Sequence, residues 1–227
     1  MDVRDPGGSP PGRVGRALVG PPRDCCHREG YMARYLVDMS SAASPRIDVV
    51  RTHLELVDRD ALRPAPVPPH PAVIHRLESI TTAEYRALYS LVGERWHWRD
   101  RLVWSIAELD AYLSRPQVSI WLLTVDGQTA GYFELQHHTI GAVEIMYFGL
   151  VSSFIGRGLG GWMLTRAVEE AFAMGGARVI LNTCTLDAPQ ALPNYLARGF
   201  RIVREERYWV ELPERPVGAA TSDVTLG

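Results

Sequence analysis

The stretch that decides the fold is the apolar run VEIMYFGL at residues 143–150, followed by the glycine-rich segment IGRGLGG at residues 155–161. The run predicts a strand, and the apolar pattern after the glycines predicts a helix, so the glycines lie at the start of that helix. Glycine lets a backbone approach an anion closely, and the N–H groups in the first turn of a helix bind negative charge. The segment therefore predicts a phosphate-binding turn, to which Arg157 adds a positive charge.

The composition is typical of a globular protein with one main domain, with 227 residues, 46% hydrophobic and 22% charged. A net charge of −2 argues against nucleic acid or an anionic membrane as a partner. No apolar run approaches the roughly 20 residues that cross a bilayer, and the N-terminus lacks the apolar core of a signal peptide, so a cytoplasmic location is expected. The three cysteines have neither disulfide nor zinc spacing, and no metal is expected.

The chain divides into an extension, a linker region, a compact domain and a tail. Residues 1–45 combine Gly, Pro, Arg and Ser without a period, which predicts a disordered N-terminal extension. Residues 46–71 hold an accessory strand, predicted from the alternation over Val50–Leu56, and a stiff proline-rich linker. The compact domain is expected over residues 72–212, and residues 213–227 are expected to form a flexible tail.

Within the compact domain, local patterns predict the order β-α-α-β-β-β-α-β-α-β. Capping boxes at Thr81 and Ser105 begin two helices, and the turn at residues 126–127 predicts a β-hairpin. A helix connects the strand that ends at Leu150 to the one that begins at Arg178, so these two strands are expected to be parallel. The predicted strands cover residues 73–77, 118–125, 129–137, 142–150, 178–183 and a region from residue 200 on. The fold class is α/β, with a mixed, mostly antiparallel central sheet flanked by helices.

Two motifs in this order resemble those of the GNAT superfamily, the acetyl-CoA-dependent N-acetyltransferases, over roughly residues 72–212. The family's phosphate signature, Gln or Arg, two residues, Gly, one residue, Gly or Ala, corresponds to Ile155–Gly160. The second motif, an alanine, a tyrosine and then Gly-Phe, corresponds to residues 191–200. The resemblance implies the GNAT fold, acetyl-CoA as co-substrate and direct transfer of the acetyl group to a primary amine, on a small molecule or a peptide.

The chain departs from the family pattern in three places. Ile155 replaces the usual Gln or Arg, and Ala188 stands where many members have asparagine, so two side-chain contacts to the co-substrate are in question while the backbone contacts remain. Residues 201–212 lack a clear turn, so the family's last β-hairpin is expected to be absent or rearranged. The resemblance assigns the co-substrate site to Leu150, Val151, Ile155, Gly156, Arg157, Gly158, Leu159, Gly160 and Gly161.

The resemblance also suggests an acid and a base for the reaction. Tyr195 matches the tyrosine that protonates the departing coenzyme A sulfur, although its ring would also pack well on a helix face. Glu144 lies eleven residues before Ile155, where the branch that resembles histone acetyltransferases carries its catalytic glutamate. The alternative for Glu144 is an outward-facing residue on a half-buried strand, sharing one face with Met146 and Phe148.

Glu134, Trp96, Trp98 and Arg101 are candidates for the acceptor site, and Glu134 also competes with Glu144 as the base. The segment that holds the tryptophans lies where the superfamily builds its substrate wall, but packing in the core is an equal alternative.

Two other functions fit parts of the sequence. The glycines also satisfy the dinucleotide fingerprint, which we reject because an antiparallel hairpin precedes them and no acidic residue follows at a strand end. A catalytically silent acyl-CoA-binding regulatory module remains the alternative to an enzyme. The oligomeric state cannot be read from the sequence, and a dimer is compatible with it.

Overall fold

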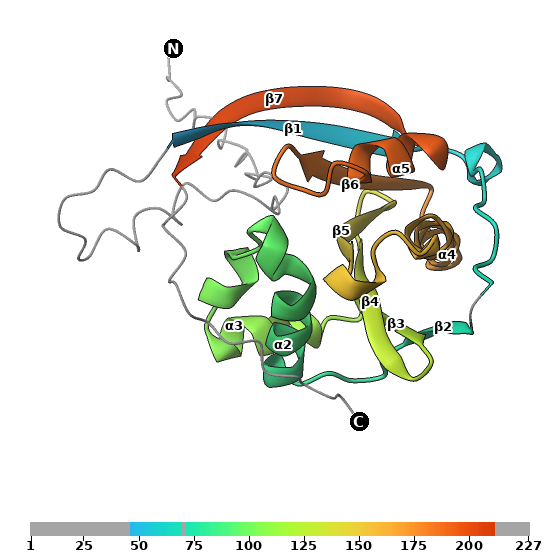
Figure 1. Ribbon diagram of the computed structural model, residues 1–227. Coiled ribbons are helices and arrows are strands. Elements are labelled where there is room, and N and C mark those ends of the chain that lie inside the picture. The colour runs from blue at the N-terminus through green and yellow to red at the C-terminus, as the bar shows by residue number, and fades with distance from the viewer. Residues whose placement is uncertain (1–45, 70, 212–227) are drawn as a thin grey trace, which may run out of the picture.

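The computed structural model describes residues 46–69 and 71–211, so the predicted extension and tail lie outside the described residues. These residues form one seven-stranded sheet in the order β2-β3-β4-β5-β6-β1-β7, with helices on both faces (Figure 1). The strands are β1 (Arg46–Leu56), β2 (Ala72–Arg76), β3 (Val118–Val125), β4 (Gln128–His137), β5 (Ala142–Leu150), β6 (Arg178–Cys184) and β7 (Arg201–Glu211). The helices are α2 (Thr82–Gly93), α3 (Ile106–Leu113), α4 (Leu159–Ala173) and α5 (Ala191–Ala197).

Four short 3-10 helices connect these elements, η1 (Arg59–Ala61), η2 (Glu94–Trp96), η3 (Asp100–Val103) and η4 (Ser152–Phe154). Both predicted capping boxes are confirmed, since Thr81 and Ser105 each accept a hydrogen bond from the third helical residue, whose glutamate bonds back. The predicted mixed sheet is also confirmed, because β5 and β6 are parallel and the other strand pairs are antiparallel. No helix in the described part of the chain is long and apolar enough to cross a membrane.

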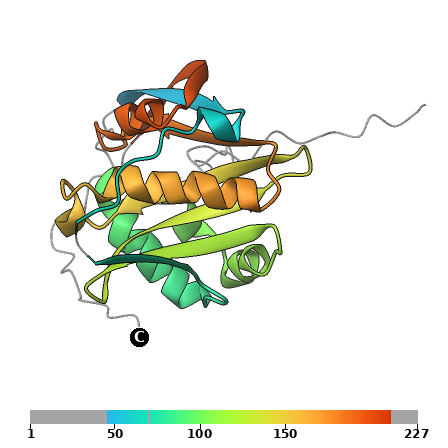
Figure 2. The same cartoon turned by 90° about the vertical axis from the view of Figure 1, so that its right-hand side faces the viewer.

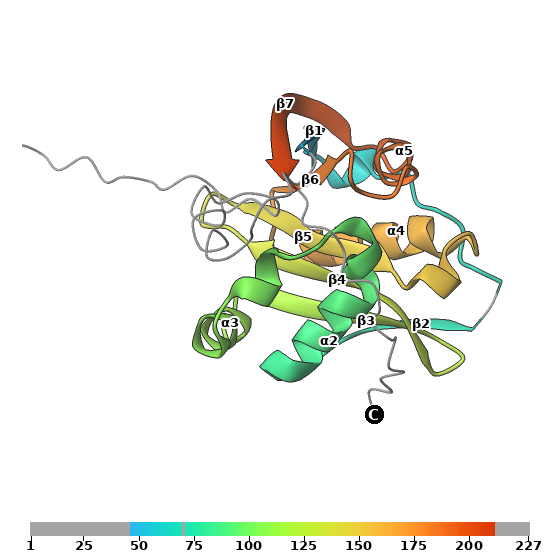
Figure 3. The same ribbon diagram turned by 60° about the vertical axis from the view of Figure 1, so that its left-hand side comes forward.

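The sheet separates two hydrophobic clusters. Helix α4 lies along one face (Figure 2), where its apolar stripe packs against β4, β5 and β6. Helices α2 and α3 lie on the other face (Figure 3) and enclose a cluster rich in aromatic residues, Tyr85, Tyr89, Tyr112, Tyr132 and Tyr147. The stripe of α4 has the helical spacing that the sequence predicts, so burial of that stripe positions the glycine turn at its N-terminus against the edge of β5.

Strand β1 lies between β6 and β7 and is antiparallel to both. The accessory strand expected from the sequence is thus an interior strand of the sheet, with Leu54 and Leu56 buried. This arrangement explains why residues 201–212 show no hairpin turn: β7 pairs with a strand that comes from the other end of the described chain. The pairing brings the segment after β1 next to α5.

Strands β5 and β6 pair over three residues only, from Ala142 to Glu144 of β5, and then separate. Strand β5 also has a bulge. Glu134 of β4 pairs with Tyr147 and Leu135 pairs with Ile145, so Met146 is an extra residue in β5. The bulge reverses the alternation of faces. Met146 therefore belongs to the cluster between the sheet and α2, whereas Phe148 packs against the cluster on the α4 side of the sheet. The prediction that Met146 and Phe148 both share a face with Glu144 is therefore wrong for Phe148.

Candidate active site

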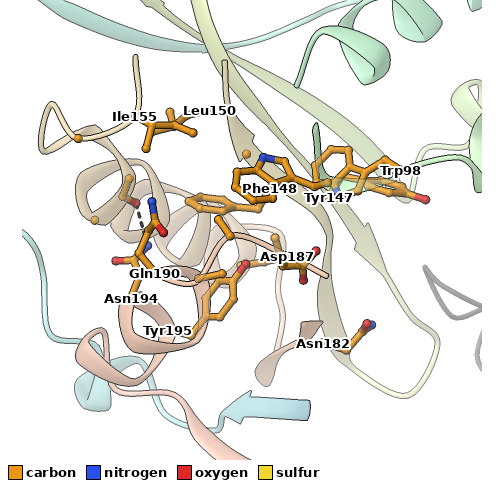
Figure 4. Close-up of a pocket in the computed structure, with 18 of the residues that line it drawn as sticks. Trp98, Tyr147, Phe148, Leu150, Ile155, Asn182, Asp187, Gln190, Asn194 and Tyr195 are labelled. Carbon is orange, nitrogen blue, oxygen red and sulfur yellow. Dashed lines mark hydrogen bonds between the residues drawn. The ribbon is translucent and has the colours of Figure 1, made fainter. Parts of the chain in front are cut away.

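A cavity of about 360 Å³ opens where β5 and β6 separate, next to the N-termini of α4 and α5 (Figure 4). One wall is the C-terminal part of β5, from Ile145 to Leu150, and another is the glycine turn. The remaining lining residues come from the segment between α2 and α3, from the end of β6 and from α5. They are Trp96, Trp98, Asn182, Asp187, Ala188, Gln190, Ala191, Asn194 and Tyr195.

The glycine turn has the geometry of an anion cradle. Gly156 and Gly158 have φ angles of 85° and 77°, which residues with a side chain rarely adopt. Gly158 is the N-cap of α4, and no side chain among the described residues accepts a cap hydrogen bond there. A Cβ on Gly156 or Gly158 would meet no described atom within 4 Å, so the space in front of both is open. The turn therefore fits a pyrophosphate, which the first N–H groups of α4 would bind.

Six of the nine residues assigned to the co-substrate line the cavity, namely Leu150, Ile155, Gly156, Gly158, Gly160 and Gly161. The other three lie next to it. Leu159 is buried in the core, and Val151 packs against both hydrophobic clusters. Arg157 lies with its guanidinium carbon 4.8 Å from the centre of the Phe154 ring. Ile155, which replaces the family's usual Gln or Arg, contributes an apolar side chain to the cavity wall.

Helix α5 contacts the first turn of α4 and adds a lining residue that the sequence reasoning did not select. The Asn194 side-chain amide donates a hydrogen bond of 3.2 Å to the carbonyl of Gly160. Arg198 lies so close to Gly161 that a Cβ there would be 2.6 Å from its Nη1. The two family-like motifs therefore meet in space. The available signal was an amide directly before Tyr195, three residues after the motif alanine Ala191.

Tyr195 lies in α5 with its ring in the core and is 6% exposed. The ring makes edge contacts with Phe148 and Phe200, with centroids 6.2 and 6.1 Å away. The residue also lines the cavity, into which its hydroxyl points in Figure 4. The contacts agree with the packing interpretation, and they direct the hydroxyl toward the cavity, while the role of Tyr195 as an acid stays a prediction.

Glu144 lies in the first part of β5, where that strand is still paired with β6, and is not among the residues that line the cavity. Its side chain is buried, and an Oε2 is 2.8 Å from Nε2 of His138. Ile145, the next residue, is the first one of β5 in the cavity wall.

Glu134 and Arg101 form a buried ion pair away from the cavity, with 3.2 Å between Oε1 and Nη2. Glu134 also accepts hydrogen bonds from the hydroxyls of Tyr85, at 2.6 Å, and of Tyr112. The structure therefore places two of the four acceptor-site candidates together in the core below α2 and α3, while Trp96 and Trp98 lie in the cavity wall.

Asp187 is a carboxylate in the cavity lining that sequence reasoning did not select for the site. Its Oδ2 accepts hydrogen bonds from the Thr183 hydroxyl at 2.7 Å and from the Cys184 N–H at 2.9 Å. Burial raises the pKa of this carboxyl above its ordinary value, although these hydrogen bonds oppose the change. The available signal was its place three residues after the C-terminal end of β6, the strand expected to be parallel to β5.

The glycine turn makes a prediction about binding. Gly158→Ala should raise the dissociation constant for coenzyme A about tenfold, because a methyl group would enter the cradle and weaken a hydrogen bond to a charged group. Gly175→Ala, at the other end of α4, is the matched control: Gly175 has a φ of 86°, and a Cβ there also meets no described atom within 4 Å. Both variants should lose similar stability in thermal unfolding. Equal affinity of the two variants for coenzyme A, measured by calorimetric titration, would contradict the assignment of the glycine turn to pyrophosphate binding.

Comparisons with known proteins agree with this fold. The chain is similar to a GCN5-related N-acetyltransferase from Kribbella flavida, with 21% identity, a TM-score of 0.51 and coverage of 69% of this chain and 56% of that one. A GCN5-related N-acetyltransferase from Sphaerobacter thermophilus has 17% identity, a TM-score of 0.50 and coverage of 75% and 54%. A tandem GNAT protein from the clavulanic acid biosynthesis pathway has 18% identity, a TM-score of 0.52 and coverage of 70% and 52%.

The aligned part thus spans about half the length of these three structures. A comparison with the sequences of curated proteins finds no match. The family model described as the acetyltransferase (GNAT) family matches residues 77–200, which include the strand that bulges, the glycine turn and the Gly-Phe motif. The chain therefore belongs to the GNAT acetyltransferase family.

Proposed function

We propose that this protein transfers the acetyl group of acetyl-CoA directly to a primary amine on a small molecule or a peptide. The observation that carries the proposal is that one cavity joins the glycine turn, the part of β5 that is no longer paired with β6, and Tyr195. The family is one of acyltransferases that use acetyl-CoA, which supports the choice of co-substrate.

The residues of the turn and of β5 have separate roles in the proposal. The first N–H groups of α4, from Leu159 to Gly161, bind the pyrophosphate, and the space before Gly156 and Gly158 admits it. Bound acetyl-CoA supplies the thioester. From Ile145 on, β5 stays paired with β4, but its other edge, which pairs with β6 as far as Glu144, faces the cavity. A backbone N–H on this edge stabilises the negative charge on the reacting carbonyl oxygen, as in an oxyanion hole.

Tyr195 is proposed as the general acid toward the departing sulfur. Tyr195→Phe should lower kcat about a hundredfold, at the low end of the range for general acids, because a thiolate leaves fairly well without a proton. The ring contacts with Phe148 and Phe200 remain in the variant, so coenzyme A affinity and thermal stability should be unchanged. A thiol-release assay measures the effect, and an unchanged kcat would leave Tyr195 with a packing role alone.

Glu144 is the general base that the sequence predicts. Because its carboxylate is bound to His138 and lies outside the cavity lining, it would act on the amine through intervening water. The prediction is that Glu144→Gln lowers kcat.

Calorimetric titration with acetyl-CoA, coenzyme A and NADH, followed by thiol release over a panel of amines, tests the function as a whole. Binding of acetyl-CoA with amine-dependent thiol release supports the enzyme. Binding without release for any amine would favour the silent acyl-CoA-binding module, and no binding of either coenzyme A species would refute both.

A further inference from the structure

Asp187 differs from the other carboxylates near the cavity in its position. Among the described residues, 46–69 and 71–211, it is the one carboxylate in the cavity lining. Glu144 and Glu134 are held outside that lining by His138 and Arg101. In Figure 4 the Asp187 side chain projects into the same cavity as the hydroxyl of Tyr195. A group that has to meet an amine inside this cavity is therefore better placed at Asp187.

The carboxylate of Asp187 is also held in a fixed orientation. Both the Thr183 hydroxyl and the Cys184 N–H donate to the same oxygen, Oδ2. A proton can therefore be accepted at Oδ1 without loss of either hydrogen bond. A base that is oriented in advance needs no rearrangement when the substrate arrives, which favours proton transfer.

The groups that surround Asp187 suit a base. Burial raises the pKa of its carboxyl. The hydrogen bonds from Thr183 and Cys184, a hydrogen bond with the Trp98 side chain and the charge of Arg51 lower that pKa to a smaller extent. Arg51 comes from β1, and its guanidinium is shared with Glu206 of β7, with 3.1 Å between Nη1 and Oε1. Tyr195 faces the cavity from α5. A carboxyl with a raised pKa accepts a proton from an ammonium group more readily than an exposed one does.

We propose that Asp187 is a catalytic residue that binds the ammonium group of the acceptor and removes its first proton at Oδ1. The proposal rests on the acetyltransfer proposed above. The neutral nitrogen then forms a bond to the acetyl carbon while the carbon–sulfur bond breaks and the sulfur takes the electron pair. The second amine proton ends on the sulfur through Tyr195, and Asp187 returns its proton to water.

Asp187→Asn is the test, because an amide oxygen can still accept the hydrogen bonds from Thr183 and Cys184. We expect kcat/KM to fall at least about a hundredfold for 2-phenylethylamine, spermidine or a lysine-ended peptide, whichever amine wild type acetylates best. Coenzyme A affinity and the melting temperature should stay the same. Asp126→Asn, in the exposed turn between β3 and β4, is the control and should match wild type.

The pH dependence separates a catalytic from a structural role. A base must be ionised, so kcat at saturating acceptor should fall as the pH drops through the raised pKa of Asp187, and this acidic limb should disappear in Asp187→Asn. Carbon-13 NMR of the free protein provides a readout independent of turnover: the carboxyl signal that Asp187→Asn removes should titrate above the ordinary aspartate range.

Three results would overturn the inference. They are activity of Asp187→Asn within about twofold of wild type, an ordinary titration of its carboxyl signal, and loss of the acidic limb in Glu144→Gln while Asp187→Asn keeps it. If wild type binds acetyl-CoA but releases no thiol with any amine, the proposed function fails and this inference fails with it. Thiol release in wild type with no effect of Asp187→Asn refutes the inference alone.

Discussion

Replacing Arg101 by methionine should lower the free energy of unfolding by about 3–5 kcal/mol, because it leaves the charge of Glu134 buried without its cation. The side chains are 4% and 0% exposed, so solvent cannot replace the lost partner. The hydroxyls of Tyr85 and Tyr112 still donate to Glu134, but they carry no charge. Methionine keeps much of the volume beside Trp104, so the loss measures the charge more than the packing.

The matched control for Arg101→Met is Arg76→Met, since Arg76 is exposed on β2 and its replacement should change stability by less than about 0.5 kcal/mol. Chemical denaturation is measured for Arg101→Met, Arg76→Met, Glu134→Gln and the double variant that combines Arg101→Met with Glu134→Gln. The double variant should lose less than the sum of the two single ones, because each single change leaves one polar group buried and unmatched. Additive losses would show that the ion pair is not the source of the effect.

This ion pair belongs to a polar network that reaches the cavity wall. The guanidinium carbon of Arg101 lies 5.3 Å from the centre of the Tyr147 ring, and the Tyr147 hydroxyl donates to Asp100. Burial raises the pKa of Asp100, and the charge of Arg101 opposes that change. Tyr147 lines the cavity, and its ring centre is 5.1 Å from that of Trp98, which also lines the cavity. The network therefore positions these two rings from the core side of the cavity wall. Arg101 and Glu134 thus support the site without lying in it.

Sequence reasoning succeeded where a feature is local. The two capping boxes, the order of elements after residue 72 and the glycine turn each depend on residues close together in the chain, and their patterns are specific. The parallel pairing of β5 and β6 also followed, because a crossover helix leaves few alternatives.

The features that the sequence did not predict depend on contacts between distant segments. Alternation over Val50–Leu56 predicts a strand, but no local pattern shows that it inserts between β6 and β7. The bulge at Met146 is likewise invisible, because an apolar run gives no sign of an extra residue, and it changes the face of Phe148. Asp187 was not selected for the site, because its place in the cavity depends on the separation of two strands.

Gly199→Ala should lower the free energy of unfolding by at least about 3 kcal/mol, since two costs combine at this position. The φ of Gly199 is 100°, so a side chain costs about 1–2 kcal/mol in backbone strain. A Cβ there would also lie 2.1 Å from the carbonyl oxygen of Ala61, in the 3-10 helix after β1, and neither backbone can move away cheaply.

Gly127→Ala separates the two costs of Gly199→Ala. Gly127 has a φ of 76°, but a Cβ there meets no described atom within 4 Å, so this variant should lose only the strain, about 1 kcal/mol. The excess loss in Gly199→Ala, measured by denaturation, then reports the contact between α5 and the segment after β1. Arg63 donates a hydrogen bond of 3.0 Å to the carbonyl of Arg198 at the same contact. Because Asn194 of α5 lines the cavity and bonds the carbonyl of Gly160 in the first turn of α4, Gly199→Ala should weaken coenzyme A binding while Gly127→Ala leaves it intact. Equal effects of the two variants on coenzyme A binding would show that the inserted strand does not position α5.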